Sequence, residues 1–302
     1  MTTAHRLNAW QTTAESLACG RTVDEQIETI RTAGNHGAIP VLRAGVLAAH
    51  GIAKPKIKAE NCVIFGCYRP FTTPFLVRDY LRLLDLLKIE YTYLDREYCC
   101  GAPLVMAASD EQRGAVMDRG REFIQLNLDL ARHKEATKLV YCCAGCVHAA
   151  RHTFSDTAGD HVAIADLIID HLEQSPLEIA PTVMGYFAGC HTVFRSMYPE
   201  AKTNWSRYRQ RLGAIQGLTL VDIPQAMCCK QSAEQIIERA QADNLDTIVC
   251  PCNWCYSSLM TAARDRVRII SLPELLLLSV GKQFAPCPEE ATYDGGGAPA
   301  SR

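Results

Sequence analysis

The chain has 302 residues, of which 48% are hydrophobic and 21% are charged. These values are typical of a folded protein of about two domains, and they exclude a chain that is mainly disordered. The formal net charge of −2 gives no electrostatic reason to expect nucleic acid or a membrane surface as the partner.

Cysteine is the unusual component of this composition, with 15 residues. A disulfide framework needs an oxidising compartment, and residues 1–11 lack the apolar core of a signal peptide. The longest apolar run, Leu275–Val280, is far shorter than the ~20 residues of a membrane span. We therefore expect a cytoplasmic protein without a membrane span, whose thiols hold metal.

The first half of the chain begins with a predicted helical extension, residues 1–57. Thr22 and Glu25 have the spacing of a capping box, and Pro40–Gly51 carries the start and stop signals of a short helix. From residue 58 the pattern becomes an α/β alternation. The predicted strands are Cys62–Cys67, Tyr91–Leu94 and Lys138–Tyr141, and helices are predicted to open at Thr73 and at Ser109, which has a capping partner in Gln112.

The second half repeats this order of elements. Its predicted strands are Val183–Phe187, Leu218–Ile223, Thr247–Val249 and Val267–Ile270, and its predicted helices are Glu200–Leu212, Ser232–Asp243 and Pro273–Gly281. The predicted fold class is α/β, with two pseudo-symmetric domains whose parallel sheets are flanked by helices. We place the domains at residues 58–180 and 181–285, followed by a flexible tail at 286–302.

The cysteines form two sets of five in the same order. In each half a single cysteine precedes an adjacent pair, which precedes a C-x-x-C motif. The intervals are 31 and 42 residues in the first set and 37 and 22 in the second. The first set is Cys67, Cys99, Cys100, Cys143 and Cys146, and the second is Cys190, Cys228, Cys229, Cys252 and Cys255. Each group follows a predicted strand, where open α/β sheets place their ligands.

The spacing within each set favours a metal cluster. Two residues between cysteines allow both sulfurs to reach one metal centre. Neighbouring side chains tend to point apart, so Cys99-Cys100 suits a large cluster better than one tetrahedral ion. Zinc, which needs four ligands, is the alternative at one or both sets. No C-x₂-C-x₂-C-x₃-C run is present, so ordinary cubane clusters would lie on another chain.

This doubled pattern resembles the tandem cysteine-rich, or CCG, domains in the family of the heterodisulfide reductase B subunit. The resemblance covers about residues 60–283. Besides the cysteine motif it is carried by FGCY at 65–68, YCCGAP at 98–103, FAGCH at 187–191 and ISLPELL at 270–276.

The resemblance implies a non-cubane [4Fe–4S] cluster in each set, held by the five cysteines named above for that set. Together the two clusters would break a disulfide or join two thiols, one electron at each. It also implies two partner subunits: a ferredoxin-like iron–sulfur subunit of the C type and a flavin subunit of the A type.

The chain departs from the family pattern in three places. Lys230 stands where the family usually has glycine, the 22-residue interval before Cys252 is short, and the extension 1–57 is additional. These differences favour a divergent branch, such as the reductase-like complexes of sulfur-oxidising bacteria. There a carrier-bound sulfur group is oxidised, so a sulfur- or lipoate-carrier protein would be a further partner.

Several other residues near the sets have candidate roles. Cys142 and Cys250 could replace Cys143 and Cys252, which the C-x-x-C spacing favours, whereas Cys19, Cys62 and Cys287 are expected to be packing or incidental thiols. Other candidates are His191 as a proton donor or a helix-start histidine, Lys230 as a counter-charge or a solvated lysine, and His148 with His152 as a metal pair. Lys202, Arg207, Arg209 and Arg211 make one helix basic, for solubility or for docking.

Three functions remain open from the sequence. The leading one is an oxidoreductase subunit acting on disulfides or thiols. The second is an iron–sulfur electron-transfer subunit of a quinone-linked oxidoreductase for glycolate, lactate or succinate. The third is a non-catalytic docking subunit stabilised by zinc or a cluster.

Overall fold

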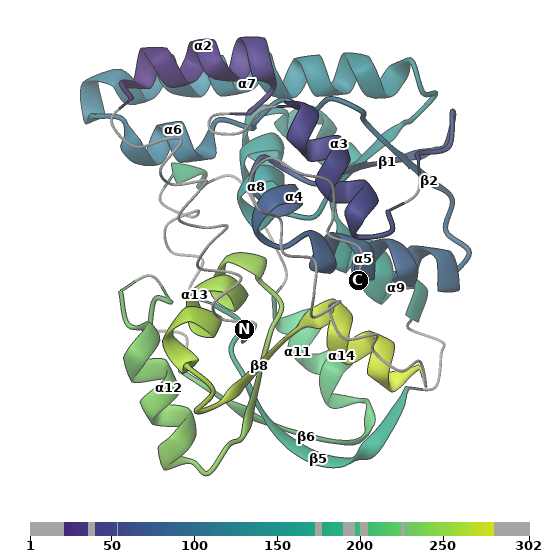
Figure 1. Cartoon of the computed structure of the whole chain (residues 1–302), viewed down its shortest axis with the longest axis vertical. Coiled ribbons are helices and arrows are strands. Elements are labelled where there is room, and N and C mark those ends of the chain that lie inside the picture. The colour runs from purple at the N-terminus through teal and green to yellow at the C-terminus, as the bar shows by residue number, and fades with distance from the viewer. Residues whose placement is uncertain are drawn as a thin grey trace, which may run out of the picture.

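A computed structural model describes residues 21–35, 40–52, 54–172, 177–189, 197–199, 205–224, 227–229 and 231–280. It confirms the predicted fold class, because the described strands form two four-stranded sheets in which all pairs are parallel. The first sheet lies in the upper half of Figure 1 and the second in the lower half. The predicted domain boundaries stay predictions.

The first sheet has the strand order β2-β1-β3-β4. Its strands are β1 (Asn61–Ile64), β2 (Tyr91–Tyr93), β3 (Lys138–Tyr141) and β4 (His161–Ala163). The helices of this half are α4 (Arg69–Thr72), α5 (Pro74–Leu86), α6 (Ala102–Ala107), α7 (Asp110–Arg132), α8 (Ala144–Thr153) and α9 (Ile164–Leu172), with a 3₁₀ turn at Ser155–Asp160.

The second sheet has the order β6-β5-β7-β8. Its strands are β5 (Glu178–Tyr186), β6 (Gln216–Asp222), β7 (Thr247–Cys250) and β8 (Arg268–Ser271), and its helices are α11 (Trp205–Gly213), α12 (Ala233–Ala242), α13 (Asn253–Ala263) and α14 (Leu272–Ser279). Counted within each half, both sheets have the order 2-1-3-4, so the predicted pseudo-symmetry extends to connectivity. In both, the chain leaves the central pair in opposite directions, and open α/β sheets bind their ligands outside the carboxyl ends of strands at such a point.

Some predicted strands have other bounds in the structure, and some elements were not predicted. The strand predicted at Cys62–Cys67 ends at Ile64, because the backbone N–H groups of Phe65 and Gly66 donate to the Glu97 carboxylate instead of to a neighbouring strand. Strand β4 is too short to show a period and was not predicted, and neither was α9. The strand predicted from Val183 begins at Glu178.

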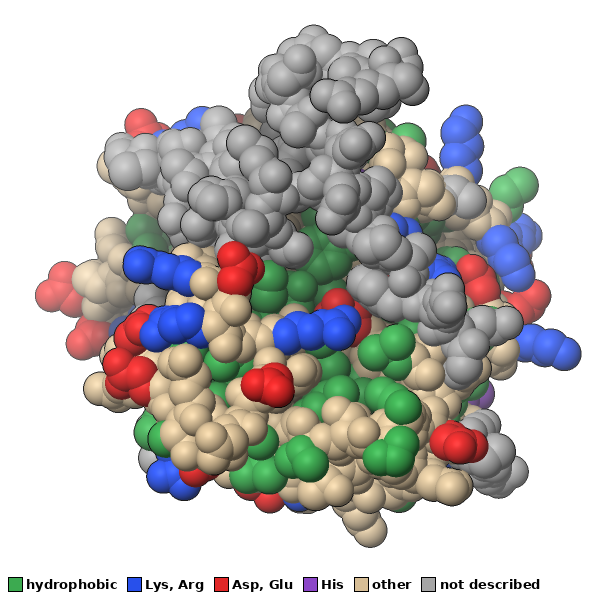
Figure 2. Space-filling model, turned by 60° about the horizontal axis from the view of Figure 1, so that its bottom comes forward, with side chains coloured by type: hydrophobic (Ala, Val, Ile, Leu, Met, Phe, Trp, Pro, Cys, Tyr) green, Lys and Arg blue, Asp and Glu red, His purple; other side chains and the backbone are tan. Residues whose placement is uncertain are grey.

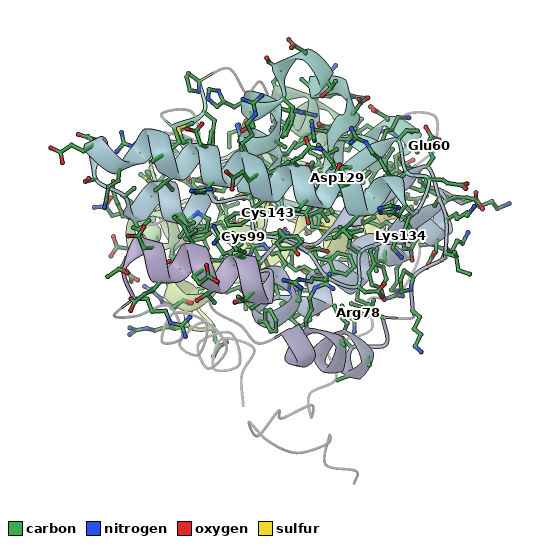
Figure 3. All side chains as sticks on the ribbon, turned by 90° about the horizontal axis from the view of Figure 1, so that it is seen from above. Glu60, Arg78, Cys99, Asp129, Lys134 and Cys143 are labelled. Carbon is green, nitrogen blue, oxygen red and sulfur yellow. The ribbon has the colours of Figure 1, made fainter. Side chains whose placement is uncertain are left out.

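The N-terminal segment contributes two described helices, α2 (Val23–Ala33) and α3 (Pro40–Ala49). The predicted capping box of Thr22 with Glu25 is confirmed, as is that of Ser109 with Gln112. Helix α2 runs beside the long α7 at the top of Figure 1, and Figure 3 shows the same pair from above. The segment therefore packs on the first half of the molecule.

The two halves share one hydrophobic core. It joins Val63 and Leu84 of the first half to Tyr186 and Leu275 of the second, all of them buried. Helix α14 packs against α5 across this boundary. The shared core fixes the two sheets relative to each other, and with them the strand ends that carry the cysteines.

The surface carries charges of both signs. In Figure 2, acidic and basic side chains surround a group of hydrophobic ones on the face that contains the lower sheet. Within the described ranges, no helix combines the length and the apolar character that crossing a membrane requires.

Candidate metal centre

The first cysteine set comes together at the carboxyl ends of β1, β2 and β3. Its thiols form a continuous chain of hydrogen bonds in the order Cys67, Cys99, Cys100, Cys146, Cys143. Figure 3 shows Cys99 and Cys143 near each other beneath α7. The expectation that adjacent cysteines point apart is wrong for Cys99 and Cys100, because residues 94–101 are not in a strand and have no side-chain alternation.

The second set has the same central arrangement. The Cys255 thiol is hydrogen-bonded to the thiols of both Cys229 and Cys252, and these two bonds, with burial, raise the pKa of Cys255 well above its ordinary value. Cys228 is half-buried next to Cys229. Cys190, the first cysteine of this set, lies outside the described residues. The structure therefore brings together three thiols of this set.

The first cysteine of each C-x-x-C motif occupies a helix N-cap, Cys143 on α8 and Cys252 on α13. The hydrogen bond from Cys146 is the main cause that lowers the pKa of Cys143 to about 6. The hydrogen bond from Cys255 likewise lowers the pKa of Cys252 to about 7. In both cases a backbone N–H at the helix start and the charge of Arg69 add to the effect, against burial. Each half thus places a cysteine with a lowered thiol pKa at the same position.

The two extra cysteines are not equivalent to each other. When the C-x-x-C motifs are superposed by number, Cys142 falls opposite Pro251 and Cys250 opposite Tyr141. Burial raises the pKa of both Cys142 and Cys250 well above the ordinary value. Cys62 on β1 is fully buried, and burial raises its pKa to about 12. These surroundings keep the three thiols protonated.

The two sets lie close together. The Asn253 side chain, next to Cys252, donates from Nδ2 to the carbonyl oxygen of Cys142 at 3.0 Å. Trp254, also within the second C-x-x-C motif, lines one pocket with cysteines of the first set: Cys67, Cys100, Cys143 and Cys146. Arg69 lines the same pocket. It is only 4% exposed, and its Nε has no hydrogen-bond partner within the described part of the chain.

A glycine before the first cysteine allows this close approach. Gly66 has φ +87°, and a Cβ there would lie 3.4 Å from the Sγ of Cys146 and 3.5 Å from the Cβ of Cys143. Gly189, immediately before Cys190, has the same φ of 87°. A side chain at either position would be strained.

The donor set fits a thiolate-bound cluster better than a hard cation, because five sulfurs meet with no carboxylate among them. The pocket that four of these thiols line has a volume of about 40 Å³. Among the described residues, no three His, Cys, Asp or Glu side chains are grouped as ligands of one metal ion.

Of the other candidate residues near the cysteine sets, some lie within the described part of the chain and some outside it. His191, Lys230, Lys202, Cys19 and Cys287 lie outside the described residues, as does the tail 286–302. His148 is buried in α8, and the ring of His152 lies 5.6 Å from that of Tyr198. On the predicted basic helix, Arg207 pairs with Asp170, and Arg209 pairs with Asp222 at 2.7 Å. These two arginines therefore form ion pairs within the chain.

Sequence reasoning missed four residues near the sets. Arg69 and Trp254 lie beside ligand candidates in the sequence, but nothing in their spacing shows that they face the other set. Glu97 and Arg43 form a buried ion pair with 2.6 Å between Nη2 and Oε1, and they are 54 residues apart in sequence. A contact of this separation leaves no local pattern.

Comparisons with known proteins find the same domain. Residues 62–150 match the CCG family, which is described as a cysteine-rich domain. The D subunit of dihydromethanophenazine:CoB–CoM heterodisulfide reductase from Methanosarcina mazei is 23% identical over 239 residues, which cover 70% of this chain and 56% of that protein. The corresponding protein of Methanosarcina acetivorans is 24% identical over 248 residues, covering 73% of this chain and 58% of that protein.

A second kind of relative is the C subunit of anaerobic glycerol-3-phosphate dehydrogenase from Escherichia coli (strain K12), with 23% identity over 57% of this chain and 43% of that protein. Among solved structures, an aspartate racemase homologue from Pyrococcus horikoshii OT3 aligns at 11% identity over 72% of this chain and 95% of that chain. Its TM-score is only 0.28, so this likeness carries no argument. The chain spans just over half the length of the heterodisulfide reductase relatives. Residues 62–150 match a CCG cysteine-rich domain, and the chain is a distant homologue of the heterodisulfide reductase D subunit.

Proposed function

We propose that the chain is the iron–sulfur subunit of a heterodisulfide reductase-like complex. Each cysteine set would hold a non-cubane [4Fe–4S] cluster, and the two sets together would break or form a disulfide. The observation that supports this proposal is the closeness of the two C-x-x-C motifs: Asn253, next to Cys252, donates to the carbonyl oxygen of Cys142, next to Cys143, and Trp254 lines the pocket of the first set.

Cleaving a disulfide takes two electrons and two protons and yields two thiols. When bound, each cluster would supply one electron and iron that can bind a sulfur atom. Two such sites on one chain match this stoichiometry. The electrons would come from partner subunits of the ferredoxin-like and flavin types, and in the oxidative direction they would return there. The named relatives are themselves subunits, which supports assembly into a complex.

The residues of the chain have separate tasks in this proposal. Five thiols of each set would hold the metal group, with Cys143 and Cys252 favoured over Cys142 and Cys250 because the former are at helix N-caps, with a lowered thiol pKa. Met106 and Trp254, each more than a third exposed, give the pocket an apolar mouth for the organic part of a substrate. Arg69 stabilises negative charge on both sets. His191 and Lys230 stay candidates for proton donation and for attracting an anionic carrier.

The similarity to a glycerol-3-phosphate dehydrogenase subunit supports a second candidate, an electron-transfer subunit without disulfide chemistry. The B rather than the D subunit as the functional counterpart, the sulfur-oxidiser branch and the cytoplasmic location are also proposals. Disulfide turnover separates the two candidates: only the first predicts that the loaded protein, given a chemical reductant, reduces an organic disulfide to two thiols.

The test of the cluster proposal is iron, acid-labile sulfide and zinc per chain on anaerobically purified protein. Two four-iron clusters predict about eight iron and eight sulfide per chain with little zinc. About four of each would restrict the proposal to one set. Zinc without sulfide that survives cluster reconstitution would contradict the redox function.

A further inference from the structure

We propose that the N-terminal segment, through Arg43, is a positioning element for the first cysteine set. Arg43 of α3 and Glu97 would hold the two loops that carry Cys67 and Cys99, and the second set would not depend on this pair. The inference rests on the proposed function only in that the first set holds a metal group.

The Glu97 carboxylate holds the loop before Cys67. It is 7% exposed, and its two oxygens accept hydrogen bonds from the backbone N–H of Phe65 at 3.1 Å and of Gly66 at 2.9 Å. Because Gly66 directly precedes Cys67 and lies against Cys146, a shift of this carboxylate would move the start of the thiol chain.

Arg43 connects this carboxylate to the second loop. Its Nη2 donates to Glu97 at 2.6 Å, and its Nη1 donates to the carbonyl oxygens of Leu94 at 2.9 Å and Asp95 at 2.8 Å. Arg43 is 7% exposed, so these bonds are made in a buried site. The planar guanidinium can satisfy all three acceptors at once, which the point charge of a lysine cannot do in the same geometry.

Helix α2 supplies a third anchor on the same loop. Gly34 ends α2 with φ +86°, and its carbonyl oxygen accepts the backbone N–H of Cys99 at 2.7 Å. A Cβ on Gly34 would lie 2.3 Å from the carbonyl oxygen of Glu97, so only glycine fits. Arg96 returns the contact by donating to the last carbonyls of α2, those of Arg31 and Thr32. The segment thus binds the backbone of the loop that carries a candidate ligand.

A buried ion pair adds little net stability compared with a well-packed apolar pair, so stability alone does not account for this one. Its geometric effect is specific, since it ties three separate pieces of chain at one point. The second half differs in sequence: the residue two positions before the second cysteine pair is Ala226, which has no carboxylate to take the place of Glu97.

The test compares Arg43→Met with Arg31→Met in the full chain. Arg31 lies in the same segment, but its ion pair with Glu28 is exposed, so this variant is the matched control. Iron and sulfide are measured per chain after anaerobic reconstitution. In the metal-free protein, the rate of alkylation is followed at each cysteine by mass spectrometry.

For Arg43→Met we expect loss of about half of the iron, with alkylation of Cys67 and Cys99 faster by about tenfold or more as their loops open. Alkylation of Cys252 and Cys255 should keep its wild-type rate, and Arg31→Met should match wild type throughout. Arg43→Lys should recover part of both effects. Wild-type labelling in Arg43→Met would overturn the inference, as would equal loss of protection in both sets. Because labelling needs no metal, this arm decides the matter even if the proposed clusters are absent.

Discussion

The two cysteine sets are built on the same sheet but are covered differently. Both sheets have the strand order 2-1-3-4, and both C-x-x-C motifs begin at a helix N-cap. Between the cysteine pair and this motif, the first half has 42 residues, which form α6 and the 23-residue α7. The second half has 22, with the 10-residue α12. The position of the thiols therefore follows from the sheet, which the halves share, whereas the helices inserted between the cysteine motifs differ in length.

The long helix of the first half presses directly on the cysteine pair. Gly101 follows the pair with φ +80°, and a Cβ on it would lie 2.8 Å from the Cα of Gly120 in α7. A Cβ on Gly120 would lie 2.9 Å from the carbonyl oxygen of Cys100. The family glycine after the first pair is thus required by a positive φ and by this helix contact. In the second half, Lys230 takes the position of this glycine. The interval that follows is too short to contain a helix as long as α7.

The largest effect is expected for Gly120→Ala, which breaks the support of the first set alone. The new methyl group has only backbone to push against, so helix α7 or the Cys100 carbonyl must move. We expect a loss of about 1–3 kcal/mol in the free energy of unfolding. Iron should fall by about half. Denaturant unfolding and metal analysis check this.

Gly114→Ala is the control in the same helix. A Cβ there would have no neighbour within 4 Å, so the substitution should stabilise the protein by about 0.5–1 kcal/mol and leave the iron content unchanged. If Gly120→Ala behaves like Gly114→Ala, the contact of α7 with the cysteine pair has no role in holding the first set.

The next largest effect is expected on the reduction potentials of the two sites, through Arg69, which acts on both sets rather than one. Since reduction adds negative charge, removing a nearby buried cation in Arg69→Gln should make both sites harder to reduce. A tenfold change in each equilibrium corresponds to ~59 mV for a one-electron couple. Redox titration followed by electron paramagnetic resonance measures each site. Arg69→Lys, which keeps the charge, should stay closer to wild type. A shift confined to one site would contradict the shared position of Arg69.

The comparison also explains how far the sequence could predict the molecule. Strands, helices and capping boxes follow from local patterns, so the fold class and the repeat were predicted correctly. The convergence of Cys67, Cys99 and Cys143 could be expected as well, because each follows a strand of one parallel sheet. The support of the set could not be predicted. Arg43 and Glu97 are joined by tertiary packing, and Gly120 gives no sign in the sequence that it touches Cys100.

The smallest effect tests the contact between the halves, through the third residue of each last helix. In α9 this is Asp166, which pairs with Arg151 at 3.3 Å and accepts from the Tyr208 hydroxyl at 2.6 Å. In α14 it is Glu274, which is 7% exposed and lies near Asp79 of α5. Burial raises the pKa of Glu274 from 4.5 to about 7, and burial also raises that of Asp79 to about 6. The carboxylate of α9 is therefore paired with an arginine, whereas Glu274 of α14 is buried near a second carboxyl group, that of Asp79 in the first half.

A raised carboxyl pKa means that the folded state binds the proton more tightly than the unfolded state. The contribution of Glu274 to stability is therefore fully present below pH 4.5 and is lost as the pH rises to about 7. Glu274→Gln keeps an acceptor for the Ser271 N–H and should remove this part of the pH dependence, making the protein more stable than wild type above pH 7. Asp166→Asn should make the protein less stable than wild type at neutral pH, since it breaks the ion pair with Arg151. Denaturant unfolding from pH 4.5 to 8 measures the free energy of unfolding of each variant. If this free energy changes with pH equally in wild type and in Glu274→Gln, the boundary between the halves does not hold a protonated carboxyl group.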